Sequence, residues 1–210
     1  MKTANKKQKL IKAKKKWQYF QKEVKTKMLN STRQLVELRK RFKNKKLVFT
    51  IGAWDLLNEG HANYLLEARK KGDLLVVGVI SDQSRQKTKG EGHPVIGEKL
   101  RAESLAHFAC VDFTVVVEND LIEVLQLLRP DVFYTIVNDW EEGERNPEEE
   151  YVVKSQGGKI IKVSKVKPYI SSLAMIDQVA SVKIRQVVFV TLGKKMGNLI
   201  LSKKIKKDEI

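Results

Sequence analysis

The sequence contains a single cysteine and no long apolar run. Cys110 has no partner with which to form a disulfide within the chain, and no second cysteine gives it the spacing of a metal site. No run of apolar residues approaches the roughly 18 that a membrane-spanning helix needs. The basic N-terminus is not followed by the apolar core and small-residue cleavage site of a secretory signal. We therefore expect a cytoplasmic protein.

Positive charge is concentrated at one end of the chain. The formal net charge at pH 7 is +16, from 41 Lys and Arg against 25 Asp and Glu. Residues 1–46 hold 18 of the basic residues and two of the acids, whereas the remainder holds 23 of each. A neutral domain therefore carries a polycationic arm, and such an arm attracts a polyanion such as RNA, DNA or an anionic membrane surface. A solvated, solubilising tail explains the same composition equally well.

The arm divides into two parts. Residues 1–16 are rich in Lys, Asn and Gln, and their low apolar content predicts a segment that is frayed or disordered when free. Beyond them, spacings of three and four indicate two helix faces. The apolar positions are Trp17, Phe20, Val24 and Met28, then Leu35, Leu38 and Phe42. Ser31 and Gln34 fit a capping box, so the second helix should begin near Thr32 and pack on the domain. The first helix could instead bind a partner, self-associate or place its aromatic residues at an anionic bilayer.

Strand-like and helix-like segments alternate from Leu47 to Ile184. Short apolar runs predict the strands, and the continuous run at 74–80 is typical of a parallel sheet covered on both faces. The expected strands are 47–51, 74–80, 113–117, 132–137 and 159–163, and the expected helices are 61–71, 99–108, 120–128, 148–155 and 171–184. This order predicts an α/β fold with right-handed crossovers, a Rossmann-like doubly wound parallel sheet whose ligands bind beyond the carboxyl ends of the strands.

A glycine-containing turn between two apolar runs predicts a C-terminal β-hairpin over residues 187–201. We therefore expect a basic helical N-terminal extension (1–46), a Rossmann-like domain (47–185), and a C-terminal hairpin with a basic tail (186–210). A hairpin leaves strand edges unpaired, and we hypothesise that these edges pair with a second copy in a homodimer.

The turn between the first expected strand and the following helix has the composition of a phosphate site. Gly52 lets the backbone approach a phosphate closely. A helix that begins near Gly60 and His61 offers free N–H groups and a positive dipole end to an anion. His61 in the first helical turn can donate a hydrogen bond to the same phosphate. Taken alone, one histidine at a helix start is more often a simple cap.

A longer likeness surrounds this turn. Residues 49–61 read Phe-Thr-Ile-Gly-Ala-Trp-Asp-Leu-Leu-Asn-Glu-Gly-His, and they resemble the GxFDxxHxGH segment of the cytidylyltransferase-like nucleotidyltransferases. The Lys-Gly-x-x-x-Pro segment at 89–94 resembles bacterial heptose-1-phosphate adenylyltransferases. Asn138-Asp139-Trp140 resembles the Asp-Asp-Trp segment of glycerol-3-phosphate cytidylyltransferases, and Ile170-Ser171-Ser172 resembles the late Ile-Ser-Thr-Thr signature of both.

The resemblance implies transfer of a nucleotide from ATP or CTP to a sugar phosphate or polyol phosphate. The substrate phosphate attacks the α-phosphorus, pyrophosphate leaves, and Mg²⁺ neutralises the triphosphate. The catalytic positions implied are His61, which stabilises the developing charge, Asn58, Lys89 and Arg101. Lys87 or Lys89, on the loop after the second strand, and Arg101 would hold phosphates. The implied nucleotide-binding positions are Ile51, Gly52, Ala53, Trp54, Gly60, Lys87, Asp139, Trp140, Ser171 and Ser172.

The chain departs from the family pattern at several of these places. Asn58 replaces the first histidine of the HxGH motif, and asparagine can donate a hydrogen bond but cannot be cationic. His93 stands where an arginine is expected, and Leu173 where a threonine is expected. The alternative is therefore a catalytically degenerate domain that binds a nucleotide, or a polyanionic partner such as RNA or the ribosome through its basic arm.

Overall fold

The computed structural model describes residues 2–118, 120–136, 147–164 and 178–181. The chain divides into two compact units, residues 1–167 and 168–210. In the second unit the described part is one helical stretch at 178–181. The predicted hairpin at 187–201 lies outside the described residues, and the predicted helix at 171–184 lies largely outside them.

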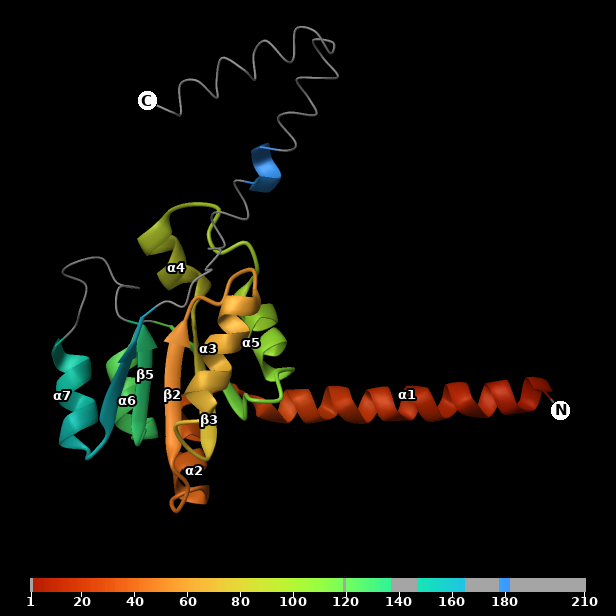
Figure 1. The fold of residues 1–210 in the computed structure, drawn as a ribbon, viewed down its shortest axis with the longest axis horizontal. Helices are drawn as coiled ribbons and strands as arrows, with labels where there is room; N and C mark the ends of the chain where they lie inside the picture. Colours follow the sequence, from red (N-terminus) through yellow and green to blue (C-terminus); the bar gives the residue numbers. More distant parts are fainter. Residues whose placement is uncertain (1, 119, 137–146, 165–177, 182–210) are drawn as a thin grey trace, which may run out of the picture. The chain divides into compact units, whose positions relative to one another are not determined.

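Helices and strands alternate through the first unit (Figure 1). In chain order they are α1 (Lys2–Lys27), β1 (Met28–Leu29), α2 (Thr32–Arg41), β2 (Leu47–Gly52), α3 (Glu59–Arg69), β3 (Leu74–Ile80), α4 (Asp82–Lys89), α5 (Glu98–Ala106), β4 (Phe113–Val117), α6 (Leu121–Leu128), β5 (Val132–Ile136), α7 (Pro147–Ser155) and β6 (Lys159–Val163). None of the helices in this described part is long and apolar enough to cross a membrane.

The six strands form one parallel sheet in the order β1-β4-β3-β2-β5-β6. The chain starts the main sheet at β2, moves outward through β3 and β4, and then returns to the other side of β2 for β5 and β6. This is a doubly wound Rossmann-like sheet, which confirms the predicted fold class. The reversal of direction falls between β2 and β5, which pair at Val48 with Val132 and at Phe49 with Phe133, the first two residues of β5.

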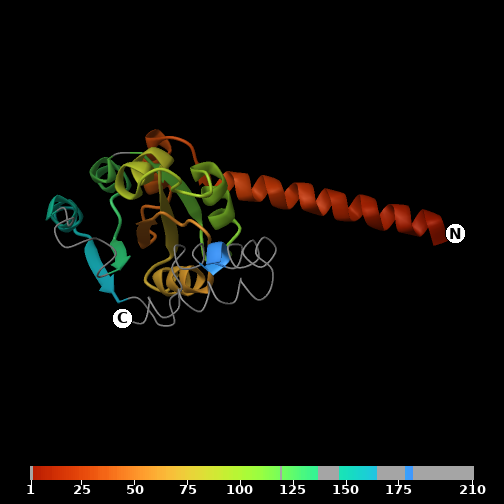
Figure 2. The ribbon, with the colours of Figure 1, turned by 90° about the horizontal axis from the view of Figure 1, so that it is seen from above.

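The core lies in two layers on opposite faces of the sheet (Figures 1 and 2). On one face, residues of α2, α6 and α7 pack against Phe49, Val76 and Phe133. On the other face, residues of α3 and α5 pack against Val48 and neighbours such as Val77. Alternate strand residues thus face opposite layers, as the two-residue period of a strand requires.

Aspartates pin the amino ends of neighbouring strands together. The Asp131 carboxylate, just before β5, accepts a hydrogen bond from the backbone N–H of Leu47 at 2.7 Å and an ion-paired one from Arg39 at 3.0 Å. The Asp112 carboxylate, just before β4, accepts from the N–H of Leu75 at 2.8 Å. These contacts satisfy the N–H of the first residue of β2 and of the second residue of β3.

The N-terminal arm is more regular than its composition indicates. The prediction of a frayed segment over residues 1–16 differs from the structure, in which α1 is a single helix from Lys2 to Lys27. Alanine, lysine and glutamine are all good helix formers, so propensity favours the helix without an apolar face. Met28, expected on a helix face, instead begins a two-residue edge strand that pairs with Thr114 of β4.

Helix α2 is an integral part of the first unit. It begins at Thr32 and buries Leu35 and Leu38 in the layer shared with α6, which confirms that this helix packs on the domain. The capping box expected from Ser31 and Gln34 is not formed. Ser31 makes no side-chain cap hydrogen bond, whereas the Gln34 side chain accepts one from the N–H of Asn30 at 2.6 Å.

Truncating Leu35 tests how strongly α2 contributes to the fold. Leu35 is fully buried, so Leu35→Ala is expected to lower the free energy of unfolding by about 3 kcal/mol, through lost burial and a residual cavity. Urea unfolding followed by circular dichroism measures the change. Leu100→Ala is the matched control, because the Leu100 side chain is 61% exposed, and it should change stability by less than about 1 kcal/mol. Equal effects of the two substitutions would contradict the packing described for α2.

Candidate functional site

The candidate site lies where the sheet reverses direction. In open α/β sheets, ligands bind beyond the carboxyl ends of the strands at this switch point. Here the switch point lies between β2 and β5, so the segment that follows β2 borders it. That segment runs from Ala53 to Asn58 and leads into α3, which begins at the same edge of the sheet. The structure thus places the predicted phosphate turn at the position where this fold binds ligands.

Asn58 and His61 form a reciprocal cap at the start of α3. The Asn58 side-chain oxygen accepts a hydrogen bond from the backbone N–H of His61 at 3.3 Å. In return, Nδ1 of His61 accepts one from the backbone N–H of Asn58 at 3.2 Å. A ring nitrogen that accepts cannot carry the proton of the neutral imidazole, so that proton is on Nε2. The cap therefore makes Nε2 of His61 the donor atom of the ring.

Trp54 explains why residue 52 is a glycine. The Trp54 indole is 5% exposed, and its Nε1–H donates to the carbonyl of Gly78 at 2.7 Å. A Cβ atom on Gly52 would lie 3.0 Å from Cε2 of this indole, a tight contact that would require the buried ring to shift by a few tenths of an ångström. Trp54 also contacts the His61 ring edge-on, with ring centroids 5.6 Å apart. The indole thus packs against both Gly52 and the His61 ring, and it contacts that ring on one side.

The backbone of the turn is held in an uncommon conformation. Trp54 has φ of 57° and Leu56 has φ of 47°, both in the left-handed region that non-glycine residues rarely adopt. Such residues cost about 1–3 kcal/mol each and persist only where the surroundings over-determine them. The surroundings here include the carboxylate of Asp55, which is 7% exposed. It accepts hydrogen bonds from the backbone N–H groups of Val95 and Ile96, at 2.8 and 3.1 Å.

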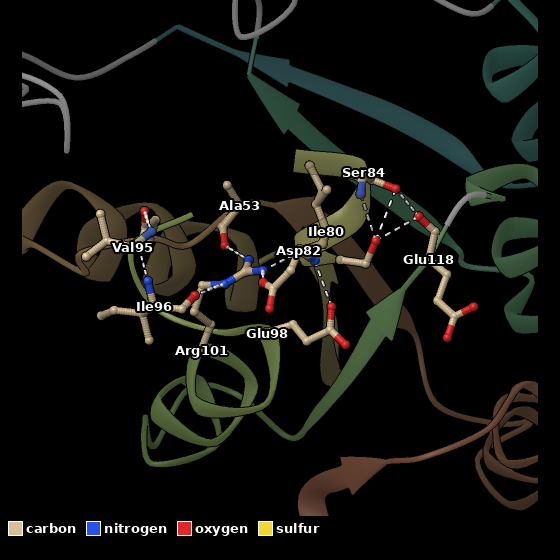
Figure 3. Close-up of polar contacts among 11 residues, drawn as sticks. Ala53, Ile80, Asp82, Ser84, Val95, Ile96, Glu98, Arg101 and Glu118 are labelled. Carbon is tan, nitrogen blue, oxygen red and sulfur yellow. Dashed lines mark hydrogen bonds and ion pairs between the residues drawn. The ribbon is translucent and has the colours of Figure 1, made fainter. Parts of the chain in front are cut away.

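Arg101 supports the same edge of the sheet from within the protein. Its buried position differs from the phosphate-binding role that the family resemblance implied for it. The Arg101 side chain has no exposed surface, and its guanidinium is already bonded to protein atoms (Figure 3). It donates to the carbonyl of Ala53, to the carbonyl of Ile80 at 2.7 Å, and to Oδ1 of Asp82 at 2.7 Å. Its Nε donates to the carbonyl of Ile96 at 2.8 Å. Arg101 therefore stabilises the loops around the site and does not present its charge to a phosphate.

Lys87 and Lys89 lie on a helix and not on the loop expected after the second strand. They occupy the last turn of α4, and both side chains are exposed. Helix α4 has no buried residues, so its sequence has no apolar periodicity from which a helix could be predicted. It is held at its start, where Ser81 accepts from the N–H of Ser84 at 3.1 Å and Glu98 accepts from the N–H of Asp82 at 2.7 Å (Figure 3). The two lysines stay candidates for contact with phosphate.

Tyr64 is a site residue to which the sequence assigned no role. Its hydroxyl shares a hydrogen bond with the Thr50 hydroxyl at 2.8 Å and donates to the carbonyl of Tyr134 at 3.0 Å. Thr50 belongs to β2 and Tyr134 to β5, so Tyr64 bridges the two strands that flank the switch point. Burial, with a smaller effect of the Glu67 carboxylate, raises the pKa of Tyr134 and keeps this phenol neutral. The sequence offers one indication that Tyr64 belongs to the site, which is its position about one helical turn after His61.

Some predicted residues cannot be placed. Asp139, Trp140, Ser171 and Ser172 lie outside the described residues. Within the described part, Ile51, Gly52, Ala53, Trp54, Asn58, Gly60 and His61 come together along the end of β2 and the start of α3. No three His, Cys, Asp or Glu side chains of the described part gather closely enough to hold a metal ion.

A doubly wound sheet with a glycine turn and a helix start at its switch point defines an α/β domain that binds ligands at its carboxyl edge. The sequence of residues 49–187 matches the cytidylyltransferase-like family, so this chain belongs to that family. This membership confirms the resemblance found at the Gly52–His61 turn, and it supports nucleotidyl transfer in general terms.

Individual relatives agree with the assignment. A protein of Syntrophotalea carbinolica named bifunctional protein HldE is 39% identical over 140 residues, which cover 65% of this chain and 27% of that protein. The chain spans about a fifth to a quarter of the length of the curated relatives it matches. A lipopolysaccharide core biosynthesis protein from Thermoplasma volcanium has a TM-score of 0.50 at 26% identity, covering 59% of this chain and 99% of that one.

A more distant structure supports the fold alone. Pantoate-β-alanine ligase from Francisella tularensis, complexed with β-γ ATP and β-alanine, has a TM-score of 0.51 at 15% identity. The likeness covers 80% of this chain and 79% of that one.

Replacing Arg101 tests its role as a brace. Arg101→Met is expected to lower the free energy of unfolding by about 3 kcal/mol, because it removes the buried cation that donates to the carbonyls of Ala53 and Ile80 and pairs with Asp82. Urea denaturation measures the loss. The control is Arg33→Met, since the Arg33 side chain in its pair with Glu37 is 88% exposed, and its effect should stay within about 0.5 kcal/mol. If Arg101→Met left stability unchanged, the brace would be refuted.

Proposed function

We propose that this chain transfers a nucleotidyl group from ATP or CTP to a sugar phosphate or polyol phosphate. An oxygen of the acceptor phosphate attacks the α-phosphorus of the triphosphate and forms a new phosphoanhydride bond. The bond between the α-phosphorus and the oxygen that bridges to the β-phosphate breaks, and pyrophosphate leaves. Such reactions depend mostly on positioning and on neutralising phosphate charge, and the turn between β2 and α3 suits both needs.

The observation that carries this proposal is the capped turn at the switch point, in a chain of the cytidylyltransferase-like family. The helix start offers backbone donors and a positive dipole end to the phosphates. The name of the Thermoplasma volcanium relative, a lipopolysaccharide core biosynthesis protein, supports a sugar phosphate as acceptor. The likeness of residues 89–94 to heptose-1-phosphate adenylyltransferases favours the same class of acceptor.

His61 is the residue we assign to charge stabilisation. Its Nδ1 is engaged with the N–H of Asn58, so Nε2 is the atom from which it donates to a phosphate oxygen. The edge contact with Trp54 and the hydrogen bond at Nδ1 hold the ring on two sides. A donor held in place before the reaction lowers the barrier more than a mobile one, because no reorganisation is needed in the transition state. Lys87 and Lys89 add positive charge from the end of α4.

Mg²⁺ does not fit the described residues as a protein-bound ion, because they provide no cluster of three ligands. Magnesium ions commonly bind through substrate phosphates and water, with one or two carboxylates at most. In the proposal the ion arrives with the triphosphate, and no role of a described residue depends on it.

Replacing His61 tests the assignment of charge stabilisation. His61→Ala is expected to lower kcat by about 10²–10³, as does removal of a preorganised oxyanion donor elsewhere. Pyrophosphate release with ATP or CTP and a panel of sugar and polyol phosphates measures the rate. Asn63→Ala is the control, because Asn63 is an exposed residue on the same helix, and its rate should match that of the unmodified chain. A rate that survives in His61→Ala would remove His61 from the mechanism.

Substituting Asn58 separates an active enzyme from a degenerate domain. Asn58→His restores the motif histidine but removes the side-chain oxygen that caps α3, at a cost of about 1 kcal/mol in stability. The proposal predicts that the unmodified chain releases pyrophosphate in the same assay. It also predicts that Asn58→His changes the rate of this release. Turnover that appears only in Asn58→His would show instead that the natural domain binds without catalysing.

A further inference from the structure

An aromatic cluster joins the N-terminal arm to α5. The ring of Phe20 contacts Trp17 of the same helix, with centroids 5.8 Å apart, and His107 at the end of α5, with centroids 5.6 Å apart. Val24, one turn further along α1, is 2% exposed. The Lys27 ammonium donates to the carbonyl of Val111 at 3.0 Å. The last turns of α1 are therefore docked on the first unit, while the Trp17 ring stays 57% exposed and that of Phe20 38% exposed.

Lysines flank this cluster on the helix surface. Lys14 precedes Trp17 by three residues and Lys16 precedes Phe20 by four, and these spacings make each pair neighbours on a helix. Both lysines are exposed. Over its whole length α1 contains 11 lysines and a single acid, Glu23. Exposed rings between ammonium groups combine a stacking platform with charge complementary to a phosphodiester backbone.

We propose that the aromatic cluster of Trp17, Phe20 and His107, with Lys14 and Lys16, binds single-stranded nucleic acid. Unpaired bases stack on the exposed rings, and the lysines neutralise the adjacent phosphates. A single strand fits better than a duplex, because bases within a duplex are already stacked on one another and do not present their faces to a protein ring. The proposal does not depend on the proposed transferase reaction.

Two other occupants fit the same surface less well. A helix that lies in a bilayer needs a broad apolar face, but Val24 and part of Phe20 already pack against the first unit. A second copy of this chain would bring two strongly basic helices together, and their like charges would repel.

The experiment is a titration of the full-length chain into a fluorescein-labelled single-stranded RNA oligonucleotide, followed by anisotropy. Trp17→Leu should weaken binding about tenfold, because one stacking platform is lost. Tyr19→Leu is the matched control, since Tyr19 is 72% exposed on α1 but lies outside the cluster, and its effect should stay within about twofold. Circular dichroism verifies that both variants keep the helix.

A second pair of variants tests the lysines through salt dependence. Replacing Lys14 and Lys16 with glutamine should reduce the slope of log affinity against log salt by about 1.4, at about 0.7 for each phosphate contact to a single strand. The same change at Lys43 and Lys45, which are exposed outside α1, should leave the slope nearly unchanged.

Three outcomes would overturn the proposal. The first is an equal loss of affinity in Trp17→Leu and Tyr19→Leu. The second is duplex RNA of the same sequence that binds as tightly as the single strand. The third is binding to phosphatidylserine-containing vesicles without binding to the RNA, which would assign the surface to a membrane.

Discussion

The buried guanidinium of Arg101 is the contact on which the carboxyl edge of the sheet depends. It joins the carbonyl after β2, the carbonyl at the end of β3, and the loop that precedes α5. Each of these part-buried carbonyls would lose a charged donor without Arg101, and leaving a buried acceptor unpaired costs about 1–3 kcal/mol. The same cation pairs with Asp82 at the start of α4. One side chain therefore positions two loops, the end of β3 and the start of α4 at the candidate site.

Asp55 completes this arrangement with the opposite charge. Its carboxylate accepts the N–H of Ile96, while Arg101 donates to the carbonyl of the same residue. The peptide groups on both sides of Ile96 are thus clamped between an anion and a cation. This clamp holds the turn that contains the left-handed residues Trp54 and Leu56, because Ala53 and Asp55 are both tied to the Val95–Ile96 loop, directly or through Arg101. A strained turn held in this way can orient His61 before any ligand arrives.

Strands were the part of the fold that the sequence predicted best. The strands β2, β3, β4 and β6 coincide with the predicted runs to within a residue. The inner strands β2, β3 and β4 are almost continuously apolar, as strands buried in a parallel sheet usually are, whereas the edge strand β6 keeps a short apolar stretch between lysines. Helix α4 went unpredicted because it buries no residue and owes its start to caps from Ser81 and Glu98. The edge strand β1 has two residues, and its identity as a strand comes from pairing with β4. Neither the cap from Glu98 nor the pairing with β4 can be recognised from the residues of α4 or β1 alone.

The candidate site shows the same division between pattern and context. Gly52 and His61 could be recognised from spacing, since a glycine turn before a helix start is a local feature. The role of Arg101 could not, because a cation in a phosphate-binding motif and a buried brace look alike until the surrounding carbonyls are known. Asn58 is a similar case. A motif comparison shows only a missing histidine, whereas the structure shows a residue that caps α3 and sets the tautomer of His61.

Helix α5 relates the site to the basic arm. Its first half carries Arg101 into the carboxyl edge, and His107 at its end contacts Phe20 of α1. A nine-residue helix with Arg101, Leu105 and other residues buried behaves as one rigid element. The support of the candidate transferase site and the docking of the arm therefore share a single helix. Since the arm holds the excess charge and the remainder of the chain is neutral, the proposed binding of a nucleic acid and the proposed transfer of a nucleotide are assigned to neighbouring parts of one unit.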